Sequence, residues 1–113
     1  MPRTVSKRPT TYAEFWPYYL AEHRARATRV CHYLGTGLGL LILLAGILAG
    51  DWRALPAALL VGYGFAWLGH LVFERNRPAT LRYPLWSFAS DFRMLALFLI
   101  GRLEAERRRR RAE

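Results

Sequence analysis

The stretch VCHYLGTGLGLLILLAGILAG, residues 30–50, contains no charged side chain and decides the fold. At a helical rise of about 1.5 Å per residue it is about 30 Å long, enough for one membrane crossing. A second apolar run, residues 54–73, follows the polar turn Asp51-Trp52-Arg53. Two such runs joined by a short turn predict a transmembrane helical hairpin, whose two open ends must lie on the same side of the membrane.

The charged residues are segregated from the apolar ones. The 113 residues suffice for one domain and are 53 % hydrophobic, yet they carry a formal net charge of +9. Nearly all of the charge falls within residues 1–29, 74–82 and 102–113. This pattern is typical of a membrane protein with basic flanks and argues against a nucleic-acid-binding protein. The single cysteine, Cys31, excludes an intrachain disulfide and a cysteine-based zinc site.

The arginines predict the orientation of the hairpin. The turn contains Arg53 alone, whereas six arginines flank the open ends: Arg24, Arg26, Arg29, Arg75, Arg77 and Arg82. By the positive-inside rule the open ends are cytoplasmic. We therefore expect an integral, multi-pass membrane protein with its basic flanks on the cytoplasmic side.

The remaining segments predict an all-α architecture with a tail at each end. We expect residues 1–10 to be a disordered basic tail, residues 11–103 to be a single membrane domain, and residues 104–113 to be a basic C-terminal tail. The arginine run in that last segment is expected near anionic lipid headgroups and not on nucleic acid.

Two further helices are expected beside the hairpin. Residues 11–24, with Thr10 or Thr11 as the cap, are rich in aromatic residues. That helix either lies at the membrane interface or packs on the rest of the domain. Residues 84–103 predict a third helix that is partly embedded or spanning. Partial embedding is favoured because it keeps the arginine run cytoplasmic.

Glycines are spaced along both apolar runs. Gly35, Gly37 and Gly39 resemble the spacing of a phosphate-binding loop, but no strand precedes them and no βαβ pattern follows. Close packing between the two helices is the expected use of these glycines, and glycine-rich faces would also permit a homodimer.

The three histidines of the chain, His23, His32 and His70, all fall at the predicted cytoplasmic end of the hairpin. A histidine at a membrane edge often only forms hydrogen bonds, but the convergence of three favours a metal site. Neutral imidazole binds iron, zinc and copper, and Glu74 and Asp91 are carboxylates expected nearby. A histidine and carboxylate site with open positions is typical of non-haem Fe(II) enzymes that use oxygen.

A shared metal requires the chain to bend. His23 and His32 are nine residues apart, so on one straight helix they would point in opposite directions and lie about 13.5 Å apart along the axis. The sequence therefore predicts a bend between Arg24 and Arg29, with Thr28 as the cap of the first spanning helix. An unbroken helix would remove one of the two histidines from the site.

Residues 12–100 closely resemble the Mpo1-like membrane proteins. The resemblance rests on motifs whose order is intact: FWPYYLAEHR at 15–24, HYLGT at 32–36, GHLVFERNRPAT at 69–80, YPLWS at 83–87 and DFRM at 91–94. It implies an Fe(II)-dependent dioxygenase that shortens long-chain 2-hydroxy fatty acids by one carbon in an α-oxidation. Carried over by position, it implies that His23, His32 and His70 are the metal ligands. Glu74 and Asp91 also fall in these motifs.

An elementary mechanism fits these residues. The acyl chain would lie in the bilayer while the carboxylate and 2-hydroxyl reach iron and O2 at the interface. Arg75, Arg77 or Arg93 would pair with the substrate carboxylate. Glu74 would be a ligand, would orient a histidine ring, or would merely pair with an arginine. Asp91, costly in a semi-buried helix, is expected in the site or paired beside Arg93.

Two alternatives come from other functional classes. One is a non-enzymatic membrane protein whose histidines bind a structural metal. The other is a carrier of lipid or heme.

Overall fold

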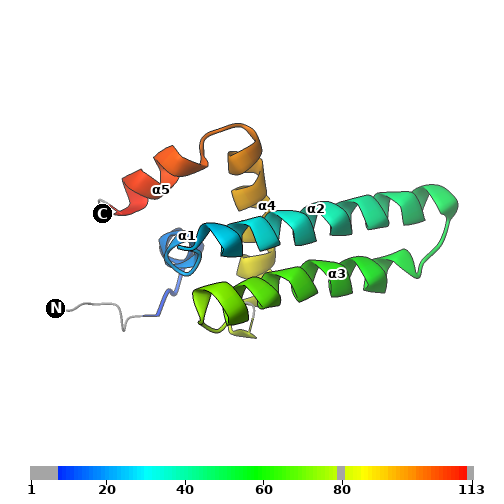
Figure 1. Ribbon diagram of the computed structural model, residues 1–113, viewed down its shortest axis with the longest axis horizontal. Coiled ribbons are helices and arrows are strands. Elements are labelled where there is room, and N and C mark those ends of the chain that lie inside the picture. The colour runs from blue at the N-terminus through cyan, green and yellow to red at the C-terminus, as the bar shows by residue number, and fades with distance from the viewer. Residues whose placement is uncertain (1–7, 79–80, 112–113) are drawn as a thin grey trace.

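Helices form the architecture of the chain in the computed structural model, which describes residues 8–78 and 81–111. The elements, shown in Figure 1, are α1 (Tyr12–Ala21), α2 (Arg26–Ala49), α3 (Ala54–Leu68), the π-helical turn η2 (Gly69–Glu74), α4 (Pro84–Leu99) and α5 (Leu103–Arg111). The described residues contain no strand, so the all-α class is confirmed. Most of the expected N-terminal tail, residues 1–7, lies outside the described residues.

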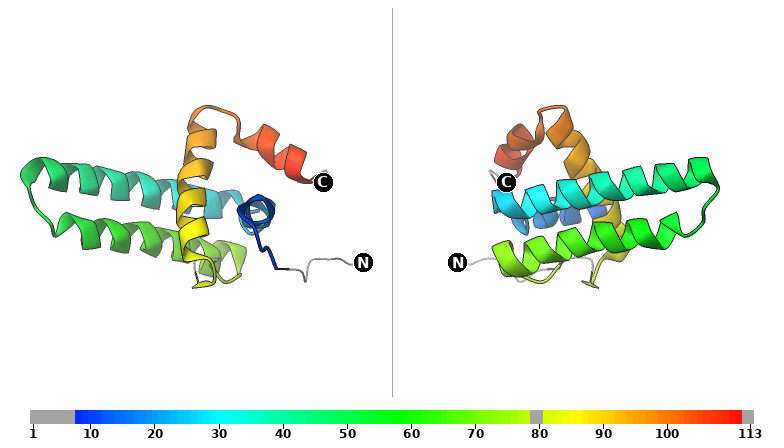
Figure 2. Two further views of the ribbon diagram at one scale, coloured as in Figure 1. Left: turned by 180° about the vertical axis from the view of Figure 1, so that it is seen from behind. Right: turned by 45° about the vertical axis from the view of Figure 1, so that its right-hand side comes forward.

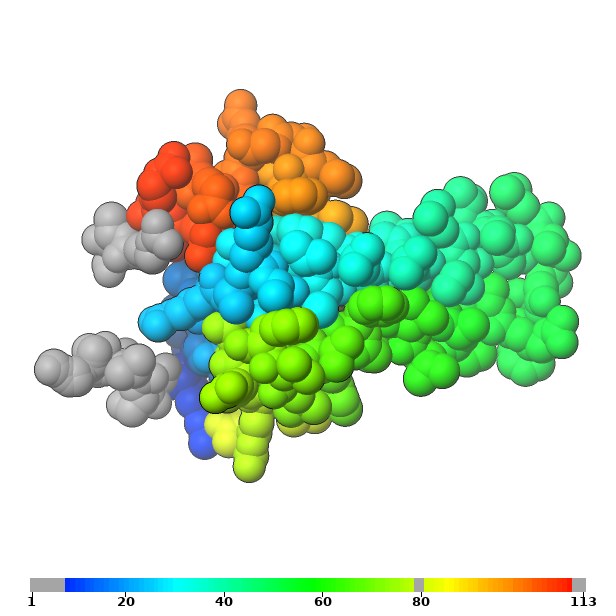
Figure 3. Space-filling model, in the orientation of Figure 1, coloured from blue at the N-terminus to red at the C-terminus, as the bar shows by residue number. Residues whose placement is uncertain are grey.

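Helices α2 and α3 form the predicted hairpin, with η2 extending α3 to Glu74 (Figures 1 and 2). The connection begins at Gly50, whose φ of 67° suits a residue without a Cβ. By length and composition, Arg26–Ala49 and Ala54–Glu74 can each cross a membrane. Their surface is largely apolar, with Leu48 80 % exposed, and Figure 3 shows the closed end of the hairpin projecting beyond the other helices.

Glycines bring the two helices of the hairpin together, as expected. A Cβ on Gly35 would lie 2.7 Å from the carbonyl oxygen of Gly62, and one on Gly39 would lie 3.1 Å from that of Ala58. A Cβ on Gly37, in contrast, would meet nothing within 4 Å. The glycines on the face of α2 that meets α3 therefore allow the two backbones to approach closely. This is the general use of glycine in pairs of membrane helices.

We predict that Gly35→Ala destabilises the hairpin by about 1–3 kcal/mol, because the added methyl group overlaps the backbone of α3. Gly37→Ala is the matched control on the same helix. It should be neutral or stabilising by up to about 1 kcal/mol, since alanine is the better helix former. Unfolding of both variants in mild detergent would measure the difference, and equal stability of the two would refute the close contact.

Helix α4 lies across the hairpin on the side of its open end, as the view from behind shows (Figure 2). It contains 16 residues and is not among the candidate membrane spans of the described chain. Its length of about 24 Å is shorter than a bilayer core of about 30 Å. Of the two alternatives for residues 84–103, this arrangement favours partial embedding.

An aromatic core fixes α1 against α4 and α5. Phe15, Trp16 and Tyr19 are at most 1 % exposed and pack with Met94 of α4 and Leu103 of α5. Of the two alternatives for this helix, these rings support packing on the rest of the domain over a position at the membrane interface. The helix is capped as expected, because the Thr11 hydroxyl accepts a hydrogen bond from the backbone N–H of Glu14.

Residues 104–111 of the expected C-terminal tail belong to helix α5. Trp16 of α1 donates its indole N–H to Glu106 at 2.7 Å, and Arg109 and Arg110 pair with the same carboxylate. Although burial acts to raise it, hydrogen bonds from Arg109, Trp16 and Arg110 hold the pKa of Glu106 at about 2. This carboxylate, together with the buried Leu103, docks the arginine-rich segment on the domain.

Candidate metal centre

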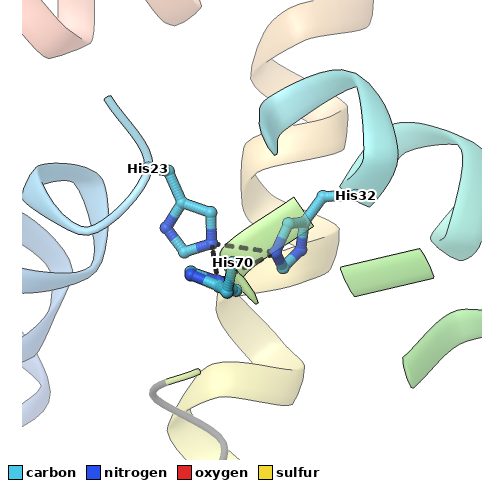
Figure 4. Close-up of side chains that lie close together, drawn as sticks. All are labelled: His23, His32 and His70. Atoms are coloured by element: carbon cyan, nitrogen blue, oxygen red, sulfur yellow. Dashed lines mark hydrogen bonds between the residues drawn. The ribbon is translucent and has the colours of Figure 1, made fainter. Parts of the chain in front are cut away.

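Three separate segments each contribute one histidine at the open end of the hairpin (Figure 4). His23 lies in the loop after α1, His32 lies in the second turn of α2, and His70 belongs to η2. All three residues are at most 4 % exposed. The fold thus removes three imidazoles from water and turns them toward one another.

The chain bends between His23 and His32, as a shared site requires. Helix α1 ends at Ala21 and α2 begins at Arg26, so residues 22–25 form a loop. The bend was expected, although it begins earlier than Arg24.

The expected role of Thr28 is wrong. Thr28 is buried in the first turn of α2, and its hydroxyl donates to the carbonyl oxygen of Gly69 at 3.4 Å. The N-cap residue is Ala25, which has no side chain able to cap. The threonine therefore ties α2 to the start of η2, close to His70 in sequence.

The Nε2 atoms of the three histidines form a small triangle. The distances are 3.0 Å between His23 and His32, 3.2 Å between His32 and His70, and 2.9 Å between His70 and His23. Among the described residues, these side chains form the group able to share one metal ion. Such spacing fits adjacent ligands of one divalent ion with metal–nitrogen bonds of about 2.1 Å.

The other nitrogen of each ring faces an oxygen. Nδ1 of His23 lies 2.6 Å from the carbonyl oxygen of Tyr19, and Nδ1 of His70 lies 2.7 Å from Oδ1 of Asn76. Nδ1 of His32 lies 3.2 Å from Asp91 Oδ1 without forming a hydrogen bond. The acceptors beside His23 and His70 assign the proton of those two rings to Nδ1, and the carboxylate beside His32 favours the same tautomer, so the three Nε2 lone pairs are directed inward.

Three inward lone pairs at this distance repel one another unless a proton or a cation lies between them. Burial and the neighbouring His32 and His70 lower the pKa of His23 well below its ordinary value, which disfavours a second proton on that ring, at Nε2. A divalent metal ion satisfies all three nitrogens at once. Neutral imidazoles suit iron, zinc and copper, so the donor set fits a first-row transition metal.

Asp91 brings α4 to the centre. Besides facing His32, its Oδ1 accepts a hydrogen bond of 2.5 Å from the Tyr19 hydroxyl. Burial and the nearby Asp91 carboxylate raise the pKa of Tyr19 well above its ordinary value, so the hydroxyl keeps its proton and remains a donor. Asp91 therefore lies beside the histidines, with its carboxylate 3.2 Å from Nδ1 of His32.

Glu74 has a role that none of the expectations described. Its Oε1 accepts a hydrogen bond of 2.8 Å from the backbone N–H of Ala25, 49 residues away in the chain. It thereby holds the loop that carries His23 against the end of η2. The ring of His70 is oriented by Asn76 and not by this carboxylate.

Sequence reasoning missed two further supports of the loop. The Asn76 side-chain N–H donates to the carbonyl oxygen of Glu22 at 3.1 Å, which also fixes the orientation of the amide. Arg29, buried in α2, donates to the carbonyl oxygen of His23 at 2.9 Å. An amide in a basic turn and an arginine on a membrane flank give no local signal of these contacts.

The three candidate substrate-binding arginines separate into two groups. Arg75 and Arg77 are exposed on the turn that follows η2, close to His70 along the chain. Arg93 lies elsewhere, with its guanidinium 4.1 Å from the centroid of the Trp16 ring and 3.9 Å from Glu106. The structure thus leaves the first two exposed a few residues after His70 and engages the third in docking α5.

Comparison with known proteins matched the chain to a protein family. No curated protein and no solved structure matched the chain. The model of the family described as 2-hydroxy-palmitic acid dioxygenase Mpo1-like matches residues 9–103. These residues include all three histidines, Asp91 and the loops that position them. The protein belongs to the Mpo1-like family.

Proposed function

We propose that the protein is an Fe(II)-dependent dioxygenase that shortens long-chain 2-hydroxy fatty acids by one carbon. The observation that supports this most strongly is the buried triangle of three Nε2 atoms, each with its Nδ1 facing an oxygen. The family description adds the substrate class. Loss of the carboxyl carbon as CO2 leaves carbon 2 as the new carboxylate, and the reaction balances with one O2 consumed and one water released.

The side chains have distinct roles in this proposal. His23, His32 and His70 would hold the iron, which supplies the redox chemistry with O2 that organic side chains lack. Asp91 keeps the His32 ring oriented, with Tyr19 holding the carboxylate in place. Burial of the rings excludes bulk water from the ligand atoms.

Arg75 and Arg77 are the proposed partners of the substrate carboxylate. They are exposed on the turn after His70, where an acid arriving from the membrane surface meets the protein. We further propose that the hairpin spans the bilayer with this centre on the cytoplasmic side. The two apolar helices and the arginines at the open end support that orientation.

The function is tested by loading the purified protein with Fe(II) without oxygen, then adding 2-hydroxyhexadecanoate and air. We expect the acid one carbon shorter, detected by mass spectrometry, with one O2 consumed per product. Protein stripped of metal and protein loaded with Zn(II) are the controls and should yield none. Failure to form the shorter acid from a series of chain lengths, or equal yield without iron, would contradict the proposal.

A further inference from the structure

An apolar cavity of about 110 Å³ runs along the hairpin beneath α4. Its walls come from three helices. The lining residues are Gly35, Thr36, Gly39, Leu40 and Leu43 of α2, Leu55, Ala58, Leu59, Gly62 and Tyr63 of α3, and Phe88, Asp91 and Phe92 of α4. We call this cavity the hairpin groove.

The hairpin groove leads to the metal centre along both helices. On α2 the lining positions Gly35, Gly39 and Leu43 continue, at helical spacing, the stripe that begins at His32. On the other helix, the lining positions Ala58 and Gly62 continue toward η2, which contains His70. The groove therefore begins about one helical turn from a proposed ligand.

The polarity of the hairpin groove changes from one end to the other. Asp91, which lies 3.2 Å from His32, lines the end nearest the histidines. The opposite end is lined by Leu43 and Leu55, about 12 Å from Gly35 along α2. A half-open apolar groove with a carboxylate at the end nearest the histidines suits a molecule with a polar head and a long apolar tail.

We propose that the hairpin groove holds the acyl tail of the 2-hydroxy fatty acid, and that Leu43 and Leu55 at its far end select chain length. This inference rests on the proposed function. The substrate thus lies along the hairpin, with carbons 1 and 2 at the histidines.

Photo-crosslinking tests the location of the tail without requiring turnover. The probe is a 2-hydroxy fatty acid with a diazirine near its tail end, added to the protein in phosphatidylcholine nanodiscs. We expect labelling at Leu43, which is half-buried, reduced by excess 2-hydroxyhexadecanoate but not by more phosphatidylcholine. Labelling spread evenly over lipid-facing residues such as Leu44 and Leu48, or displaced equally by phospholipid, would overturn the proposal.

A substitution at the far end tests chain-length selection. Leu43→Trp should lower kcat/KM for the longest acids by about tenfold relative to shorter ones, the order of discrimination that apolar pockets achieve. Leu44→Trp is the matched control, because Leu44 is 53 % exposed and lies outside the groove; its chain-length profile should equal that of the unmodified protein. Equal profiles for both variants would overturn the proposal.

The two experiments separate this inference from the proposed function. Labelling of the groove without any shortened acid would refute the reaction and leave the acyl site standing. Shortened acid with no groove labelling and an unchanged profile in Leu43→Trp would refute the groove and leave the reaction standing.

Discussion

His32→Ala is expected to abolish retention of Fe(II) by the purified protein. The substitution removes one of three ligand atoms that lie within 3.2 Å of one another. The affinity should fall by more than the roughly 10–100-fold that loss of a supporting residue costs at metal sites. Anaerobic iron loading, desalting and elemental analysis would measure the retained metal.

Cys31→Ala is the control for this prediction. Cys31 is the adjacent residue of α2 and is also buried, but its sulfur is not in the group of side chains able to share the ion. The variant should retain iron like the unmodified protein, and circular dichroism would verify that both variants fold. Iron retained in His32→Ala and lost in Cys31→Ala would indicate a thiolate site and contradict the histidine centre.

Asp91→Asn is expected to weaken Fe(II) binding by roughly 10–100-fold, the usual effect of removing a carboxylate that supports a metal-bound histidine. The substitution keeps the size of the side chain and an oxygen for Tyr19, but it removes the negative charge beside Nδ1 of His32. Competition with a chelator would give the affinity.

Tyr19→Phe separates the charge of Asp91 from its position. The variant keeps the carboxylate and removes only the hydrogen bond of 2.5 Å that holds it. We expect a smaller loss of affinity than in Asp91→Asn. An unchanged affinity in Asp91→Asn would show that the carboxylate does not support His32.

The hairpin and its histidines were predictable because their signals are local. Uncharged runs of spanning length define the helices, and the turn between them forces His32 and His70 to the same end. The bend after His23 also followed from geometry, since nine residues of straight helix would separate it from His32. Asp91 was expected near the site because a carboxylate in a semi-buried helix needs a partner.

The supporting contacts were not predictable because they join residues far apart in the chain. Glu74 reaches Ala25 across 49 positions, and the Asn76 side chain reaches Glu22 across 54.

The docking of helix α5 was not predictable from its local sequence. Its composition indicates a solvated tail, yet two residues decide otherwise: Leu103 enters the aromatic core, and Glu106 accepts the indole N–H of Trp16. These two long-range contacts hold the arginine-rich helix on the domain. Nothing in the local pattern indicates that contact.

The most direct test of the central claim is X-ray absorption spectroscopy of the protein loaded with one equivalent of Fe(II) without oxygen. The three-histidine centre predicts scattering from three imidazole rings at about 2.1 Å, with the remaining ligands light atoms. A sulfur scatterer at about 2.3 Å, or a spectrum that requires fewer than three imidazoles, would contradict it.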